Sequence, residues 1–251
     1  MNQTTERIAL VTGVSHEKGI GRAISKKLAE EKYDVFFTYW QTKSDWPNQF
    51  IQEIRDSGVR CAGMEIDLAH EDAPYQLLDE VERTLGLPNV IVNNAAYSLN
   101  DGYKNLDVKL LDDHYAVNMR TPILLSTEFA KRFQQNNKTY GRIINMTSGQ
   151  ALGPMTGELA YVATKGAISA FTLSLSAELA PLGITVNAVN PGPTDTGWMT
   201  EQLKQELLPK FLMGRIGQPE DAARLVAFLA SEEAEWITGQ VINSEGGFYR
   251  K

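Results

Sequence analysis

The sequence predicts an α/β fold, a single-domain doubly wound parallel sheet with helices on both faces. Short apolar runs, which are typical of buried parallel strands, alternate along the chain with longer stretches that have helical spacing. Strand and helix in this order give a parallel sheet, and right-handed crossovers place helices on both of its faces. No repeat, low-complexity tract or Gly/Ser/Pro-rich linker interrupts the alternation, so residues 1–251 are predicted to form one domain.

Five apolar runs are clear strand candidates, and six stretches have helical spacing. The strands are predicted at 8–11, 35–37, 90–92, 142–144 and 185–189. The helices are predicted at 20–31, 46–57, 72–85, 110–133, 161–180 and 219–230. Pro219 followed by Glu220 and Asp221 marks a helix start, because proline suits the first turn and acidic side chains suit the positive end of the helix dipole.

Composition argues against several classes of protein. The formal net charge of −7 argues against nucleic-acid binding, which normally needs a basic face. No stretch approaches the roughly 18 consecutive apolar residues of a membrane helix, and the polar residues 1–7 contain no secretory apolar region. The single Cys61 excludes an internal disulfide and fits a reducing compartment. Since His16, His114 and Cys61 have no metal-ligand spacing, we expect a cytoplasmic protein with no metal site, nucleic acid or membrane partner.

A glycine-rich loop follows the first predicted strand and reads TGVSHEKGIG over residues 12–21. Glycine lets the backbone turn sharply and approach a pyrophosphate, whose charge then lies at the N-terminus of the following helix. A tight turn with nothing bound is the alternative. The place of the loop, after the first strand of an alternating α/β chain, favours the ligand.

With these glycines the sequence resembles the short-chain dehydrogenase/reductase family, whose fingerprint is T-G-x3-G-x-G. Five residues separate Gly13 from Gly19 here instead of three. A longer loop of this kind is similar to that of the enoyl-acyl-carrier-protein reductases, a branch of the same superfamily. The resemblance implies a Rossmann-type dinucleotide-binding domain. It also implies cofactor contacts within the loop at Gly13, Ser15, Lys18, Gly19, Ile20 and Gly21.

The cofactor is expected to be NADP(H) in preference to NAD(H). Strict NAD users carry an acid after the second strand that binds the ribose 2′-hydroxyl, whereas here the first acid after residues 36–43 is Asp45. Tyr39 lies in this stretch and is a candidate contact. The resemblance places Lys18 where NADP-dependent relatives usually carry an arginine, and a cation there would pair with a 2′-phosphate. An exposed loop lysine is the alternative.

Further segments resemble cofactor-binding motifs of the family. Residues 93–96 read NNAA after the fourth strand and resemble N-N-A-G, with Ala96 in place of glycine. Residues 191–196 read PGPTDT and resemble P-G-x3-T, which typically holds the nicotinamide carboxamide. The family also places an aspartate after the third strand against the adenine amino group. The implied contacts are Asp67, Leu68, Asn94, Ala95, Ala96, Pro191, Gly192, Thr194 and Thr196.

Tyr161 and Lys165 are the predicted catalytic pair. Residues four apart lie on one helical face, so both can serve one site. A phenol with a pKa of about 10 is a poor base at neutral pH, but a neighbouring ammonium stabilises the phenolate. Tyr161 would then exchange a proton with the substrate oxygen, and Ser148 would hydrogen-bond that oxygen. Y-x3-K alone occurs in many helices, and the upstream Ser148 and glycine-rich loop favour the catalytic interpretation.

By the same resemblance, Asn118 holds a water in the proton relay behind the lysine, and Tyr161 and Lys165 also contact the cofactor. The chain looks like the 3-oxoacyl-acyl-carrier-protein reductases, with an extended glycine-rich loop. We therefore expect an oxidoreductase that moves a hydride between NADP(H) and a carbonyl or secondary alcohol, with a 3-oxoacyl thioester as the first substrate class to test. The family also suggests a homotetramer.

Two alternative functions stay open. Enoyl-thioester reduction is suggested by the long loop, but that branch usually has six residues between its tyrosine and lysine, where this chain has Ile168. A non-catalytic dinucleotide-binding regulator would usually lack a catalytic residue, and none is missing here. The apolar residues of 197–213 could line a substrate cleft or pack as a short helix on the domain, so the sequence identifies no substrate.

Overall fold

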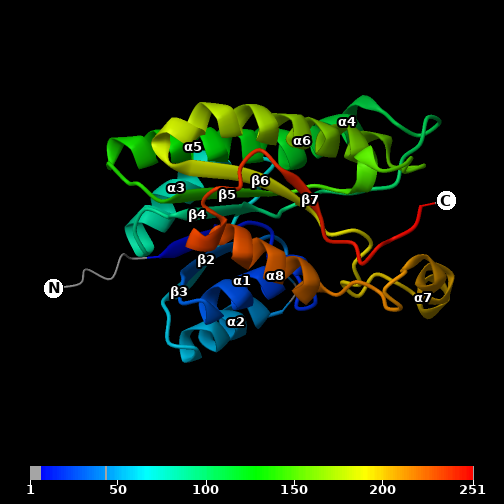
Figure 1. Ribbon diagram of the computed structural model, residues 1–251, viewed down its shortest axis with the longest axis horizontal. Helices are drawn as coiled ribbons and strands as arrows, with labels where there is room; N and C mark the ends of the chain where they lie inside the picture. The colour runs from blue at the N-terminus through cyan, green and yellow to red at the C-terminus, as the bar shows by residue number, and fades with distance from the viewer. Residues whose placement is uncertain (1–6, 43, 251) are drawn as a thin grey trace.

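The computed structural model describes residues 7–42 and 44–250 of the chain, so residues 1–6, 43 and 251 of the predicted domain lie outside the described part. Within that part, seven strands form one all-parallel sheet in the order β3-β2-β1-β4-β5-β6-β7 (Figure 1). The strands are β1 Ile8–Val11, β2 Asp34–Tyr39, β3 Cys61–Glu65, β4 Val90–Asn93, β5 Gly141–Met146, β6 Ile184–Asn190 and β7 Val241–Asn243.

Helices cover both faces of the sheet. The α-helices are α1 Ile20–Glu30, α2 Trp46–Asp56, α3 Ala73–Thr84, α4 Val108–Tyr115, α5 Thr121–Gln135, α6 Leu159–Leu179, α7 Glu201–Leu207 and α8 Pro219–Ala230. Buried side chains of α1, α2 and α8 form one core with the sheet, and those of α3, α5 and α6 form a second core on the opposite face. Figure 1 shows these two helix layers with α7 projecting beyond them. No helix in the described ranges is both long and apolar enough to cross a membrane.

The predicted fold class is confirmed, since strand order reverses between β1 and β4 as a doubly wound sheet requires. The apolar runs did not mark two strands of the sheet. In β3, Gly63 replaces a large side chain because the Phe37 ring occupies the space, 3.1 Å from where a Cβ would lie. In β7 two of the three residues are exposed, as suits an edge strand.

The predicted helix over 110–133 is interrupted. A π-helical turn at Ala116–Arg120 separates α4 from α5. Asn118 lies in this turn and is buried, and its side chain pairs with the backbone of Tyr97 at 2.7 and 2.8 Å. This pairing gives the widened turn a physical reason, and such turns occur often at functional sites.

A buried polar network joins the sheet to the helices behind the site. Asn93 Nδ2, at the end of β4, donates to Asn145 Oδ1 on β5 at 2.8 Å. Asn145 Nδ2 in turn donates to Thr172 Oγ1 on α6 at 2.9 Å. Because each buried amide has partners, the network fixes α6 against the carboxyl ends of β4 and β5 at little cost in unsatisfied polar groups.

Candidate active site

The loop after β1 and the loop after β4 are in direct contact. Gly13 has a φ of +74°, and a Cβ there would lie 2.8 Å from Ala95 N and 2.9 Å from Ala95 Cβ. Asn94 Nδ2 donates to the carbonyls of Thr12 and Gly13 at 2.8 and 3.0 Å. Thr12 Oγ1 accepts from the amides of Asn94 and Ala95 at 3.0 and 3.1 Å. The two loops therefore form one rigid floor, and only glycine fits at position 13.

Helix α1 begins at this floor with its N-terminus free of side-chain caps. Gly19 is the N-cap residue and makes no side-chain hydrogen bond, and the first turn contains no acidic residue. The N-terminal amides of a helix carry partial positive charge and bind phosphate groups. The glycine-rich loop therefore fits a pyrophosphate.

A cavity of about 490 Å³ opens above the loop at the ends of β1, β2 and β3, and we call it the β1-side cavity. The sequence-predicted contacts that line it are Gly13, Ser15, Tyr39, Asp67, Leu68, Ala95 and Ala96. Trp40 and Gln41 line it as well and were missed, because no local motif marks the turn after β2, and His16 of the glycine-rich loop also lines it. Ser15 Oγ accepts from Trp40 N at 3.0 Å and so fixes that turn. A cavity of this size at the strand-order reversal suits the nucleoside of a dinucleotide.

A second cavity of about 780 Å³ lies at the ends of β5 and β6, and we call it the β5-side cavity. The predicted residues that line it are Ile20, Ser148, Tyr161, Pro191, Gly192, Thr194 and Thr196. Ser148 follows β5, and Tyr161 lies in the first turn of α6. The Ser148 hydroxyl donates to Met155 Sδ at 3.7 Å, and it lies near enough to the Tyr161 phenol to lower the pKa of that phenol. The structure thus brings the predicted serine and tyrosine together at one end of a cavity large enough for a small substrate.

Tyr161 is protonated at neutral pH in this environment. Burial raises the pKa of its phenol to about 12, and the Ser148 hydroxyl only partly opposes this. The sequence predicts that Lys165 stabilises a phenolate, and Lys165 Nζ lies 5.6 Å from the ring centroid. The phenol keeps its proton at neutral pH.

Lys165 is almost fully buried beneath Tyr161. Its Nζ donates to the Met146 carbonyl at the end of β5 at 2.8 Å. Burial lowers the pKa of the ammonium to about 8, because water no longer solvates the charge. Lys165 lines neither cavity in the described structure, and it reaches the site from behind the tyrosine.

Asp101 fixes the start of α6, a role that no local sequence pattern revealed. Its carboxylate accepts from the amides of Leu159 and Ala160, both at 2.7 Å. Burial opposes the charge, but these amides and that of Gly102 outweigh burial and hold the pKa of Asp101 below its ordinary value. A carboxylate at a helix N-terminus stabilises the helix, so Asp101 holds the turn that carries Tyr161.

Asn118 acts on the site through its neighbours. Besides the Tyr97 backbone, its Nδ2 donates to Thr164 Oγ1 on α6 at 3.2 Å. Both polar atoms of the side chain are therefore engaged with the protein. Asn118 positions α6 and the strand-to-helix loop, and the water contact expected of it stays a prediction.

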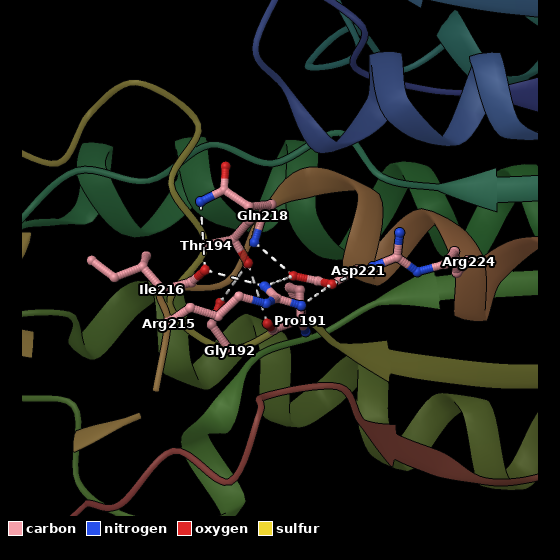
Figure 2. Close-up of polar contacts among 8 residues, drawn as sticks. All are labelled: Pro191, Gly192, Thr194, Arg215, Ile216, Gln218, Asp221 and Arg224. Atoms are coloured by element: carbon pink, nitrogen blue, oxygen red, sulfur yellow. Dashed lines mark hydrogen bonds and ion pairs between the residues drawn. The ribbon is translucent and has the colours of Figure 1, made fainter. Parts of the chain in front are cut away.

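The loop after β6 is fastened to the start of α8. Figure 2 shows Thr194 close to the carbonyls of Pro191 and Gly192, to each of which its Oγ1 donates at 3.2 Å. Asp221 lies between Arg215 and Arg224 in the same view. Hydrogen bonding from Arg215 lowers the pKa of Asp221 to about 2.

A backbone hydrogen bond joins the same two segments, since Asp195 N donates to the Gly217 carbonyl at 2.9 Å. This bond and the ion-pair cluster together keep the loop rigid at the wall of the β5-side cavity. The Thr194 hydroxyl donates to carbonyls of its own loop. Pro191, Gly192 and Thr196 line the same cavity, and their contacts with the cofactor stay predictions.

Some predicted contacts do not line either cavity in the described residues. Lys18 is one, and its Cδ lies 3.5 Å from where a Cβ of Gly197 would be. The other predicted contacts that line neither cavity are Gly19, Gly21 and Asn94. They shape the glycine-rich loop. The part of the chain that the structure describes holds no cluster of metal-ligating side chains. Cys61 is buried, and burial raises the pKa of its thiol to about 12.

The sheet, the glycine-rich floor and the paired cavities define a dinucleotide-binding oxidoreductase. Residues 13–249 match the family model described as enoyl-(acyl carrier protein) reductase. The chain belongs to the short-chain dehydrogenase/reductase family. Members of this family bind a nicotinamide dinucleotide and act between an alcohol and a carbonyl, so this chain is an oxidoreductase of that kind.

Three relatives illustrate the range of the family around this chain. It is 60% identical to the uncharacterized oxidoreductase YjdA of Bacillus subtilis (strain 168), over 100% of both chains. It is 35% identical to the 3-oxoacyl-[acyl-carrier-protein] reductase FabG of Staphylococcus epidermidis, over 96% of this chain and 98% of that protein. The crystal structure of acetoin dehydrogenase YohF from Salmonella typhimurium superimposes with a TM-score of 0.87 at 28% identity, covering 97% of this chain and 96% of the other.

Lys165→Met is expected to raise the free energy of unfolding by about 1–3 kcal/mol at pH 7, because it removes the cost of burying a charge. The gain is greatest below pH 8, where the folded protein carries the charge. It shrinks as the pH rises from about 8 towards 10.5, because the buried amine is then neutral while the unfolded lysine is still protonated. Urea unfolding at pH 7 and at pH 10 measures the difference.

Lys131→Met is the matched control, because Lys131 is exposed on α5 and its replacement should change stability by less than about 0.5 kcal/mol. A gain at Lys165 that did not depend on pH would contradict the burial of a charged lysine.

Proposed function

We propose that the protein reduces a carbonyl compound to a secondary alcohol, and oxidises the alcohol in reverse, with Tyr161 as the proton donor and NADP(H) as the cofactor. The observation that carries this proposal is that the Tyr161 phenol and the Ser148 hydroxyl line the β5-side cavity together, with the buried Lys165 Nζ 5.6 Å from the centroid of the Tyr161 ring. A small ketone or a 3-oxoacyl thioester is the proposed substrate class, supported by the likeness to 3-oxoacyl-[acyl-carrier-protein] reductases.

In the proposed reduction, each catalytic side chain has one task. The reduced nicotinamide, when bound, supplies a hydride to the carbonyl carbon. Tyr161 gives its phenolic proton to the carbonyl oxygen, so that the C=O bond becomes CH–OH and a phenolate remains. The Ser148 hydroxyl donates a hydrogen bond to the same oxygen as negative charge develops there. Lys165 stabilises the phenolate until a proton from solvent restores the phenol.

The proposed preference for NADP(H) is supported by the turn after β2. Trp40 and Gln41 line the β1-side cavity there, and neither carries a negative charge. The acid that follows them, Asp45, accepts a hydrogen bond from Asn48 Nδ2 at 2.6 Å at the start of α2. One feature competes with the preference, because Glu65 Oε1 accepts from Gln41 N at 3.1 Å and adds negative charge near the turn. Lys18, at the end of the glycine-rich loop, is the proposed cation for the 2′-phosphate.

Ile168 favours carbonyl reduction over enoyl reduction. The enoyl branch would have its lysine at this position, but Ile168 is a fully buried apolar residue on α6. The buried ammonium below Tyr161 comes from Lys165 instead, one turn after the tyrosine. A non-catalytic dinucleotide-binding protein would not need the perturbed pKa values of Tyr161 and Lys165. Such perturbed values are typical of functional sites, so they favour the enzyme.

We also propose a homotetramer in the cytoplasm, in which α6 packs on a symmetry mate. Leu173 on α6 and Phe228 on α8 are exposed apolar side chains, as is Val241 on the edge strand β7. Gly166 faces open space, so another helix could approach closely. Light scattering of the purified protein tests the assembly, and a monomer would overturn it. The single buried cysteine fits the reducing cytoplasm.

Tyr161→Phe is expected to lower kcat for ketone reduction by about 100-fold or more, because the ring stays but the proton donor is lost. The affinity for the cofactor should change by less than about threefold. Steady-state kinetics and fluorescence titration measure the two quantities. Tyr75→Phe, at an exposed tyrosine of α3, is the matched control and should leave both unchanged. Retained turnover in Tyr161→Phe would exclude it as the proton donor.

Lys18→Ala is expected to weaken NADPH binding by about tenfold and NADH binding by less than about twofold, because only NADPH carries the 2′-phosphate. Titration of nicotinamide fluorescence with each cofactor measures the dissociation constants. Lys26→Ala removes an exposed lysine that is ion-paired with Glu53, and it should leave both affinities unchanged. Equal losses for the two cofactors, or tighter NADH binding by the wild type, would overturn the NADP(H) assignment.

A further inference from the structure

Residues 244–250, of which Phe248 and Arg250 line the β5-side cavity, are called the strap. Tyr249 N donates to the Lys210 carbonyl at 2.8 Å, and Met213 N donates to the Gly246 carbonyl at 3.2 Å. The rings of Phe211 and Phe248 pack with their centroids 4.9 Å apart. The strap is therefore fastened along its length to the segment that follows α7.

At the end of the strap, Arg250 is held in one orientation by a buried carboxylate. Arg250 Nη1 donates to Glu245 Oε2 at 2.8 Å, and Nη2 contacts Oε1. The Glu245 side chain is only 8% exposed, and its Oε1 also accepts from Asn190 Nδ2 at 2.7 Å. The guanidinium carbon lies 5.2 Å from the centroid of the Phe248 ring. A bidentate pair that rests on an aromatic ring fixes the plane of the guanidinium.

The loop after β5 leaves room for this arginine. A Cβ at Gly149 would lie 3.0 Å from Arg250 Cζ, and a Cβ at Gly153 would lie 3.2 Å from Arg250 Cδ. Gly149 directly follows Ser148, which lines the β5-side cavity together with Tyr161. The guanidinium thus lies against the backbone next to the reacting groups, where any side chain at position 149 would collide with it.

The ion pair presents its positive end to the substrate cavity. Arg250 lines the β5-side cavity, whereas Glu245 lines a separate one on the other side of the strap. A guanidinium has five N–H donors, and Glu245 is the only hydrogen-bond acceptor for Arg250 among residues 7–42 and 44–250. Lys210 adds a second cation to the lining. Glu158 is the acid that lines it, and burial together with the nearby charge of Asp101 raises the pKa of its carboxyl.

We propose that Arg250 determines substrate specificity by binding a carboxylate of the substrate, so that the preferred substrates are short oxo acids. The inference rests on the proposed carbonyl reduction and names its substrate class. Arg250 is a substrate-binding residue, and Glu245 is the positioning residue that orients it. A planar carboxylate can pair with the N–H groups that Glu245 leaves free, while the ketone oxygen lies at Ser148 and Tyr161.

Acetoacetate and ethyl acetoacetate are a matched pair of probes, because only the acid carries a negative charge. Calorimetric titration onto the NADP⁺-loaded protein measures both dissociation constants without turnover. The wild type is expected to bind the acid at least about tenfold more tightly than the ester. In Arg250→Met this ratio should fall by about tenfold, and in Glu245→Gln by about threefold. Arg250→Lys should keep part of the preference, because the charge remains but bidentate pairing is lost.

Arg83→Met is the control, because Arg83 is an exposed arginine paired with Glu80 on α3, and the ratio should equal that of the wild type. Unfolding midpoints and NADPH titrations of the variants identify any loss of fold, in which case Arg250→Lys carries the test. Equal binding of acid and ester by the wild type would overturn the inference, as would equal weakening of both in Arg250→Met. Failure of the proposed mechanism is distinguished by a different result, because it would appear as retained turnover in Tyr161→Phe.

Discussion

The architecture of the site depends on one close approach, that of Gly13 to Ala95. Strand order reverses between β1 and β4, and the loops that leave these strands would normally diverge into a crevice. Here a backbone without a side chain, held by the amide of Asn94, brings them together. Gly13 and Ala95 both line the β1-side cavity, so this contact shapes its floor. A larger residue at position 13 would collide with Ala95 and displace the two loops.

The catalytic end of the molecule combines rigid support with a costly buried charge. Asp101 holds the first turn of α6, and the Asn93–Asn145–Thr172 network holds its middle. Between these supports lies Lys165, whose ammonium costs stability where it is placed. A looser helix would let the lysine reach water and regain its ordinary pKa. The surrounding hydrogen bonds therefore keep a perturbed group in place, as functional sites require.

The sequence allowed the fold and the motif-bearing half of the site to be predicted, and the reason is geometric. Gly13, Asn94, Ser148 and Pro191 each follow a strand closely, so a correct strand order places all four at one edge of the sheet. Strand β3 lacks an apolar run and was not marked, since its neighbour Phe37 fills the space that a large side chain would take.

Residues whose role depends on a distant partner could not be predicted in this way. Asp101 caps a helix 58 residues away in sequence, and Asn118 pairs with a backbone 21 residues before it. Arg250 meets Gly149 only because β5, β6 and β7 are neighbours in the sheet. The burial that raises the pKa of Tyr161 is likewise a property of the packed structure and of no local pattern.

The buried Cys61 has a consequence for the chemistry that an oxidoreductase of this kind encounters. Carbonyl compounds and their unsaturated derivatives are electrophiles, and thiolates are the protein nucleophiles that react with them most readily. The only thiol of this chain lies within β3 and remains protonated at neutral pH, because burial raises its pKa to about 12. The chain therefore presents no accessible thiolate to electrophiles of this kind.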